Sequence, residues 1–149
     1  EDVTKLSDLS EQFGGLQAMQ TDFNNDGLMD VFIPRGAWLE SPVRPTLLRN
    51  EGDFKFVDVT EKAGLMASTN SNSAQWADFN NDGWLDVVIV GERQPHLLYR
   101  NNGDETFTEV SIQAGVIKRQ AVFAKGSTWI DYDNDRYPDL FVNNLDGVP

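Results

Sequence analysis

Hydrophobic and polar residues alternate along this chain in short stretches. Lys55–Thr60 and Thr106–Ser111 intersperse apolar with polar residues, as strands with alternating side chains do, whereas Asp86–Val90 is a short apolar run. β-Branched and aromatic residues fill such stretches, and Gly, Asn, Asp and Pro separate them. No sustained helical periodicity is present. The pattern predicts an all-β fold of many short strands.

The predicted strands recur in units of four. A first strand leads into an acidic loop, a second leaves the loop, a third ends in an Asn-x-Gly-Asp hairpin turn, and a fourth follows the turn. The first strands are expected around Leu16–Thr21, Ser73–Ala77 and Gly126–Ile130. The second strands are expected at Asp30–Ile33, Asp86–Val90 and Asp139–Val142. The third strands are expected at Thr46–Arg49 and His96–Arg100, and the fourth at Lys55–Thr60 and Thr106–Ser111. A single helical turn ending at Gly64 or Gly115 is expected after each fourth strand.

Sequence landmarks repeat in the same order as these strands. The acidic loop starts at Asp22, Asp78 and Asp131, at near-equal intervals. An Arg-Asn-x-Gly-Asp segment follows the first two loops, and each copy is followed by a Phe-containing strand and an Ala-Gly pair. Landmarks that keep their order and spacing indicate an internal repeat.

Tandem four-stranded units of this length are typical of β-propeller blades. Ser7–Glu11 resembles a fourth strand, and the segment ending at Val142 supplies two strands of a third unit. We therefore expect one repeat region over residues 1–149, with about two and a half blades. Because propellers usually close with four to eight blades, the chain is expected to be a fragment or an assembling unit whose open edges pair with other copies.

The charge balance excludes several classes of partner. The chain has 24 acidic and 12 basic side chains, a formal net charge of −12, and no Lys/Arg cluster. Nucleic acid and anionic membrane surfaces are therefore not expected to bind. No apolar run is long enough to span a membrane. Glu1–Thr4 does not resemble a signal peptide, so we expect any secretion signal to be removed or to lie outside this sequence.

The acidic loops place oxygen atoms at alternate positions, a pattern that lets them converge on one hard cation. The candidate ligands are side chains at loop positions 1, 3, 5 and 9 and the backbone carbonyl at position 7. In the first loop these are Asp22, Asn24, Asp26, Leu28 and Asp30. In the second they are Asp78, Asn80, Asp82, Trp84 and Asp86, and in the third Asp131, Asp133, Asp135, Tyr137 and Asp139. Gly27 and Gly83 stand where the chain must turn sharply.

Calcium is the cation that this donor set favours. An EF-hand is excluded because its position 12 requires Glu, whereas Ile33, Ile89 and Val142 stand there in strand patterns. Zinc and copper favour His or Cys, but the chain has one His and no Cys. Magnesium keeps more of its waters and is expected to bind less well. We expect up to three Ca²⁺ ions that act as structural staples.

The third loop differs from the other two. Arg136 replaces the glycine, and Asp133 replaces the asparagine at loop position 3. The added carboxylate favours cation binding, whereas the guanidinium and the lost glycine oppose it. The sequence does not decide whether the third loop binds a cation more strongly or more weakly than the other two.

The single histidine and the four tryptophans are further candidates for a structural or functional role. His96 is expected to be structural, and Trp76 and Trp129, each two residues before a loop, are expected to pack between blades. At Trp84 the backbone oxygen is expected to matter more than the ring. Trp38, in the connection between Pro34 and Pro45, is a candidate contact for sugar or protein.

The repeated motifs resemble the FG-GAP/VCBS family of β-propeller repeats, whose relatives include the propellers of integrin α-subunits. The sequence from Leu48 to Leu65 also resembles repeats of cartilage acidic protein and of bacterial proteins with ASPIC/UnbV regions. The resemblance extends from about Leu6 to Val142. Phe13-Gly14-Gly15 lacks a following Gly-Ala-Pro, so the integrin similarity is architectural. The resemblance implies a calcium-stabilised propeller of extracellular or periplasmic proteins, commonly in adhesion or matrix interaction.

These observations favour a non-enzymatic, calcium-binding structural or interaction module of a secreted, extracellular or periplasmic protein. Its ligand, protein or carbohydrate, is not identified by the sequence, and no catalytic residue is assigned. One alternative is an accessory propeller of a larger secreted enzyme. Another is a self-assembling unit that forms rings or fibres through open blade edges.

Overall fold

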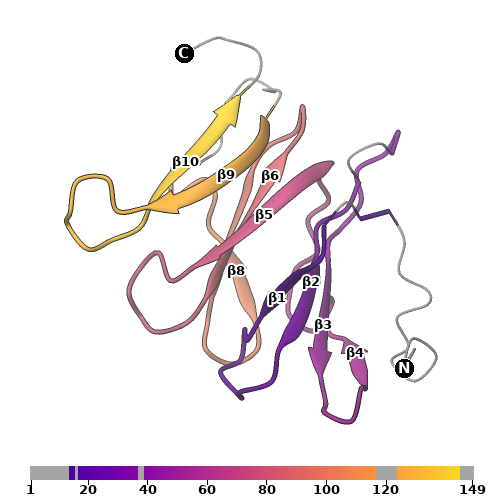
Figure 1. The fold of residues 1–149 in the computed structure, drawn as a ribbon. Coiled ribbons are helices and arrows are strands. Elements are labelled where there is room, and N and C mark those ends of the chain that lie inside the picture. The colour runs from indigo at the N-terminus through magenta and orange to yellow at the C-terminus, as the bar shows by residue number, and fades with distance from the viewer. Residues whose placement is uncertain (1–13, 16, 37–38, 117–123, 145–149) are drawn as a thin grey trace.

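The structure, a computed structural model, describes residues 14–15, 17–36, 39–116 and 124–144. These residues form ten strands in three antiparallel sheets, which stand side by side (Figure 1). The first blade contains β1 (Met19–Thr21), β2 (Asp30–Ile33), β3 (Thr46–Asn50) and β4 (Phe56–Asp58). The second blade contains β5 (Ser71–Ala77), β6 (Asp86–Gly91), β7 (Leu97–Asn101) and β8 (Phe107–Glu109). The third sheet contains β9 (Ala124–Ile130) and β10 (Asp139–Asn144).

The sheet order confirms the predicted four-strand unit. The strands of each blade are hydrogen-bonded in sequence order, β1 to β4 and β5 to β8. The all-β fold and the two and a half blades are therefore as predicted, and the described residues form no closed ring of sheets. The strand predicted at Ser7–Glu11 lies outside the described residues. Among the described residues, no helix has the length and apolar character needed to cross a membrane.

The fourth strands are shorter than predicted. β4 ends at Asp58 and β8 at Glu109, although the alternating pattern continues beyond both residues. The Thr60 hydroxyl accepts a hydrogen bond from the Leu47 amide (2.8 Å), and the Ser111 hydroxyl accepts one from the Leu98 amide (2.8 Å). A side-chain oxygen thus takes the place of a backbone carbonyl, so the chain leaves the sheet without stranding a buried donor.

The predicted helical turn follows each fourth strand. The Ala63 amide donates to the Val59 carbonyl (2.7 Å), and the Ala114 amide donates to the Val110 carbonyl (2.9 Å). Gly64 then adopts a φ of 79°, a conformation that ends helical turns and that glycine adopts without strain. The turn returns the chain to the next blade.

The hydrophobic core lies between the first and second blades. Phe32 of β2 meets the indole ring of Trp76 of β5 edge-on, with ring centroids 5.4 Å apart. Trp76 also contacts Phe107 of β8 edge-on at 6.0 Å. Edge-to-face pairs of this kind add to the free energy gained by burying the rings. Trp76 therefore packs between blades, as predicted.

The second blade and the third sheet pack in a similar way. Figure 1 shows β9 beside β5, and the two strands are in contact. The Trp129 indole stacks on the ring of Phe79, with centroids 6.3 Å apart and planes inclined by 9°. Trp129 thus holds the place between sheets that was predicted for it.

Candidate metal centre

Each acidic loop joins the first and second strands of its sheet. The loops connect β1 to β2, β5 to β6 and β9 to β10, and Figure 1 shows them following one another along one side of the structure. Because neighbouring sheets repeat the same connection, the candidate ligands of all three loops gather on this side.

The loop backbone turns at the positions where sequence placed glycine. Gly27 and Gly83 have φ values of 86° and 89°, and no atom lies within 4 Å of a Cβ added to either. Arg136 takes the same position in the third loop with a φ of 75°. For a residue with a Cβ this conformation costs roughly 1 kcal/mol. The third loop therefore keeps the turn but at a conformational cost.

The first aspartate of each loop is fixed by backbone amides. Asp22 accepts hydrogen bonds from the amides of Asp26 (3.0 Å, Oδ1) and Gly27 (3.0 Å, Oδ2). Asp78 accepts the equivalent pair, at 2.9 and 2.8 Å. Asp131 accepts one from the Arg136 amide at 3.1 Å. These bonds hold each carboxylate in one orientation before any ligand is considered.

The side chains at positions 1, 3 and 5 lie around the same turn. In the second loop, the Asp82 amide donates to both Asp78 Oδ1 (2.9 Å) and Asn80 Oδ1 (3.0 Å). The first loop repeats this arrangement at 3.0 and 3.4 Å. The oxygens of positions 1 and 3 are therefore neighbours in both loops.

Position 9 carries a buried carboxylate in the first two loops. Asp30 and Asp86 are fully buried. Asp30 accepts hydrogen bonds from the amides of Phe23 (3.2 Å) and Asn50 (2.8 Å), which belong to the loop and to β3. Asp86 accepts the same pair from Phe79 (3.1 Å) and Asn101 (2.8 Å). The carboxylate at position 9 thus accepts hydrogen bonds from both the loop and the third strand of its blade.

Burial raises the pKa of Asp30 and Asp86 to about 6, because a charged carboxylate loses its hydration there. The amide hydrogen bonds lower the pKa of each group, and the nearby loop aspartates raise it further. Burial therefore destabilises the ionised form of these two side chains relative to the protonated form. A cation beside them would favour that form.

Asp139 differs from its two counterparts. It accepts a hydrogen bond from the Tyr132 amide (3.0 Å) but is exposed to solvent. The described residues of the third sheet supply only two strands, so no strand equivalent to β3 or β7 covers it.

The third loop allows a direct test of fit for a cation. Carboxylate oxygens of Asp131, Asp133 and Asp139 all lie within 4.8 Å of one another. Two ligands that bind one calcium ion at about 2.4 Å lie at most about 5 Å apart, so the spacing of the three carboxylates is compatible with one shared ion. This is the one such acidic cluster among the described residues, and Asp135 is outside it.

In the first two loops the position-5 carboxylate also accepts a hydrogen bond from the side chain at position 3. Asp26 accepts hydrogen bonds from the Leu28 amide (2.8 Å) and from the Asn24 side chain (2.9 Å). Asp82 does the same with Trp84 (2.9 Å) and Asn80 (2.8 Å). Both loops contain oxygen ligands of the types that calcium prefers, and the ligand roles of the carbonyls at Leu28, Trp84 and Tyr137 stay predictions.

Asn50 and Asn101 belong to the candidate site, although the sequence pattern indicates only a turn role for them. Beyond their amides, their side chains donate to the carbonyls of Met29 (3.0 Å) and Leu85 (3.1 Å), immediately before the buried aspartates. The repeated Arg-Asn-x-Gly-Asp segment was the signal that could have identified them.

The side chains of His96 and Trp84 are packed against other parts of the second blade. His96 is buried, and its Nδ1 accepts a hydrogen bond from the Gly91 amide (3.2 Å), so the predicted structural role is confirmed. The Trp84 ring lies against Gly103, where an added Cβ would be 2.8 Å from the indole nitrogen. Trp38 lies outside the described residues.

Comparison with known proteins places the chain among relatives. The model of the FG-GAP-like repeat matches twice, over residues 22–89 and 78–142. Cartilage acidic protein 1 of Xenopus tropicalis is 30% identical over an alignment of 105 residues that covers 66% of this chain and 16% of that protein. The human protein of that name is 32% identical over 108 residues (66% and 15%), and the Mus musculus protein is 31% identical over 108 residues (66% and 16%).

This chain therefore spans about a sixth of the length of the relatives it matches. Both matches of the repeat model begin at the first aspartate of an acidic loop, and each continues into the second strand after the following loop. The matched residues include all three loops and every strand from β2 to β9. The chain belongs to the FG-GAP-like repeat family, whose repeats form propeller blades.

Proposed function

We propose that this chain is a calcium-binding, non-catalytic repeat module of a secreted protein, in which up to three ions stabilise the blades. The observation that carries the proposal is the convergence of Asp131, Asp133 and Asp139, whose oxygens lie within 4.8 Å of one another. The loops of both blades share with the third loop the hydrogen bond from the position-6 amide to the first aspartate. Residues 1–149 would then act as one repeat region.

A bound calcium ion supplies two positive charges and six to eight coordination positions for oxygen. A positive charge would stabilise the ionised carboxylates of Asp30 and Asp86, because each side chain is fully buried and its pKa is raised by that burial. Each also accepts a hydrogen bond from the third strand of its blade. Ion binding at position 9 would thus stabilise the contact between the loop and the centre of the sheet.

Location outside the cytoplasm is part of the proposal. The relatives carry the name cartilage acidic protein, and this chain is itself acidic, with a net charge of −12. Millimolar calcium outside cells fills sites of modest affinity, whereas cytosolic calcium is far lower. A protein or carbohydrate ligand is expected, and nucleic acid is not, because the acidic surface repels it.

Calorimetric titration of the metal-free chain with CaCl₂ tests the proposal, together with thermal melting in calcium and in chelator. We expect binding heat and a higher melting temperature in calcium, since a ligand that binds the folded state stabilises it. Titration with MgCl₂ is the matched control and should give weaker binding. No heat and an unchanged melting temperature would contradict the proposal.

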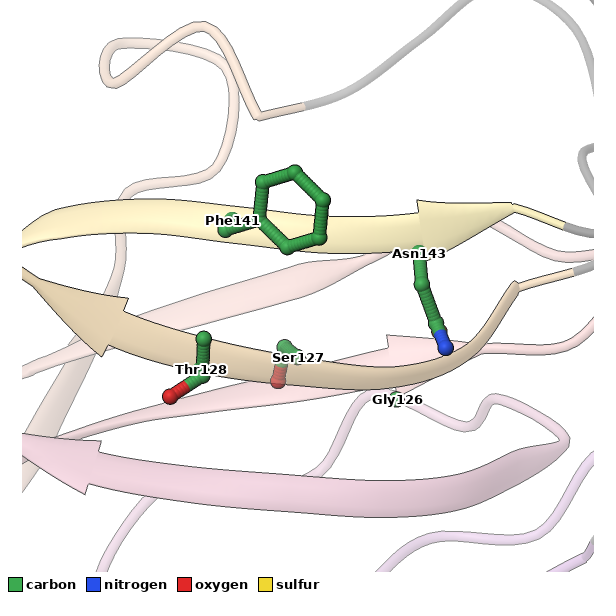
Figure 2. Close-up of a pocket in the computed structure, with 5 residues that line it drawn as sticks. All are labelled: Gly126, Ser127, Thr128, Phe141 and Asn143. Atoms are coloured by element: carbon green, nitrogen blue, oxygen red, sulfur yellow. The ribbon is translucent and has the colours of Figure 1, made fainter.

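Self-assembly is a second candidate function, and the outer face of the third sheet favours it. Phe141 of β10 pairs in register with Thr128 of β9, and Figure 2 shows both side chains. Trp129, the neighbour of Thr128, stacks on Phe79 of the second blade, so Phe141 and Thr128 lie on the opposite face of the sheet. Phe141 is 62% exposed, whereas its counterparts Phe32 and Val88 are 0% exposed beneath the next sheet. A second copy of the chain that covered this face would continue the packing already present twice.

Analytical ultracentrifugation of Phe141→Lys tests this second candidate. We expect the unaltered chain to self-associate and Phe141→Lys to shift it towards monomer, because a charge in the interface must be desolvated. Phe54→Lys, at a side chain 60% exposed on the hairpin of the first blade, is the matched control and should leave association unchanged. A monomeric unaltered chain would exclude this function.

A further inference from the structure

Neighbouring acidic loops are joined by a repeated hydrogen bond from an asparagine side chain. The Asn25 Nδ2 donates to the Gly83 carbonyl of the second loop, at 3.2 Å. The Asn81 Nδ2 donates to the Arg136 carbonyl of the third loop, at 3.0 Å. Both donors stand at loop position 4, and both acceptors stand at position 6 of the following loop. The sequence pattern predicted no role for position 4.

The backbone at position 4 turns these side chains towards the next loop. Asn25, Asn81 and Asn134 have φ values of 56°, 57° and 63°, a region that asparagine adopts more readily than most residues with a side chain. Loop positions 1, 3 and 5 direct their side chains around their own turn. Position 4 thus serves the neighbouring loop rather than its own.

The accepting carbonyl belongs to a peptide unit that also holds a candidate ligand. The peptide group between Gly83 and Trp84 accepts from Asn25 through its oxygen and donates to Asp82 through its N–H, at 2.9 Å. The peptide group between Arg136 and Tyr137 likewise accepts from Asn81 and donates to Asp135 at 2.8 Å. Because a peptide unit is planar, fixing its oxygen fixes the direction of its N–H.

We propose that Asn25 and Asn81 are positioning residues that couple the calcium sites of adjacent loops, so that binding at one loop increases affinity at the next. This inference rests on the proposed calcium-binding function. An ion that orders one loop also orders its position-4 asparagine, which then holds the ligand-bearing peptide of the following loop. The second ion then pays a smaller entropy cost for ordering its loop and binds more tightly, which is positive coupling. By thermodynamic linkage, each ion raises the affinity for the other by the same factor.

Calcium titration of the full chain with single asparagine variants tests this coupling. Asn25→Ala and Asn81→Ala remove the donor, and we expect each to lower the Hill coefficient and to weaken binding at the adjacent loop by about 3-fold, the scale of one hydrogen bond. Asn25→Gly and Asn81→Gly should show the same loss while they tolerate the positive φ.

Asn134→Ala is the matched control for the backbone effect. Asn134 has the same loop position and a similar φ of 63°, and no further acidic loop lies in the described residues after it. This variant should change the intrinsic affinity of the third site but leave the coupling between sites intact. The Hill coefficient therefore separates coupling from a merely structural loss of loop stability, which melting of the metal-free variants measures.

The outcomes distinguish the coupling from the proposed function. If the unaltered chain binds no calcium, both proposals are wrong. If it binds calcium at sites that titrate independently, or if Asn81→Ala and Asn134→Ala change the Hill coefficient equally, the coupling is wrong and calcium binding stands. A loss of coupling confined to Asn25 and Asn81 variants supports the inference.

Discussion

Arg136 and Gly83 occupy the same position in their loops, and both adopt a positive φ, of 75° and 89°. Glycine reaches this conformation without strain, whereas arginine does so at a cost and adds a positive charge beside a candidate cation site. The third loop has compensating features, because Asp133 replaces the asparagine of the other loops and lies in the cluster with Asp131 and Asp139. The two tendencies can be separated by substitution.

Arg136→Gly is expected to stabilise the chain by about 1 kcal/mol, since it removes a strained φ. It should also raise calcium affinity at the third loop severalfold, because a nearby positive charge is lost. Calorimetric titration and thermal melting measure the two effects. Arg93→Gly, which removes a positive charge at another residue with positive φ (55°), should not alter calcium affinity. Weaker calcium binding by Arg136→Gly would contradict the view that the Arg136 side chain opposes calcium binding at the third loop.

Asp86→Asn is expected to remove one calcium site. The substitution keeps the size of a fully buried side chain but removes the charge that an ion would neutralise. We expect the number of ions bound per chain, measured by equilibrium dialysis, to fall by one, and the calcium-induced rise in melting temperature to shrink. Asp53→Asn, at an exposed hairpin position, should change neither. An unchanged number of bound ions would show that Asp86 is not a ligand.

Calcium-free stability is expected to decrease as pH rises through about 6. Burial raises the pKa of Asp30 and Asp86 to about 6 from 3.8, so the folded state holds protons that the unfolded state has lost. The stability that these protons provide is fully present below the unfolded pKa and disappears above the folded one, on the order of 3 kcal/mol for each residue.

Calcium should reverse this dependence, because it binds the ionised carboxylates. The difference in melting temperature between calcium-loaded and metal-free protein is therefore expected to grow from about pH 5 to about pH 7. Melting curves across this range measure it. A metal-free protein that becomes more stable over the same interval would contradict the raised pKa of Asp30 and Asp86.

Trp76→Ala is expected to destabilise the chain by about 3 kcal/mol, because the indole joins Phe32 and Phe107 across the interface between blades. Trp129→Ala, which loses a single stacked partner at the edge of the second blade, should cost less. Urea unfolding in saturating calcium compares the two variants. Equal losses would indicate that the interface between the first and second blades has no special share in stability.

The sequence was informative wherever structure depends on neighbouring residues. The limits of β2, Asp30–Ile33, were predicted correctly because a loop aspartate opens an apolar run. The fourth strands were overestimated because the hydroxyls of Thr60 and Ser111 replace the backbone as acceptors, which an alternating pattern does not reveal.

Contacts between distant segments could not be predicted in the same way. The burial of Asp30 depends on the Asn50 amide of β3, twenty residues away in sequence. The bond from Asn25 to Gly83 depends on how two blades are rotated against each other. The candidate ligands were therefore identifiable from their spacing, whereas their hydrogen-bond framework and their coupling required the fold.

Anomalous diffraction from crystals grown in calcium tests the central claim most directly. We expect a peak in each acidic loop, with side-chain oxygens of Asp131, Asp133 and Asp139 at about 2.4 Å from the ion in the third loop. We expect equivalent ions beside the buried carboxylates of Asp30 and Asp86. Loops without anomalous peaks, in crystals whose calcium exceeds millimolar levels, would contradict a calcium-stabilised repeat.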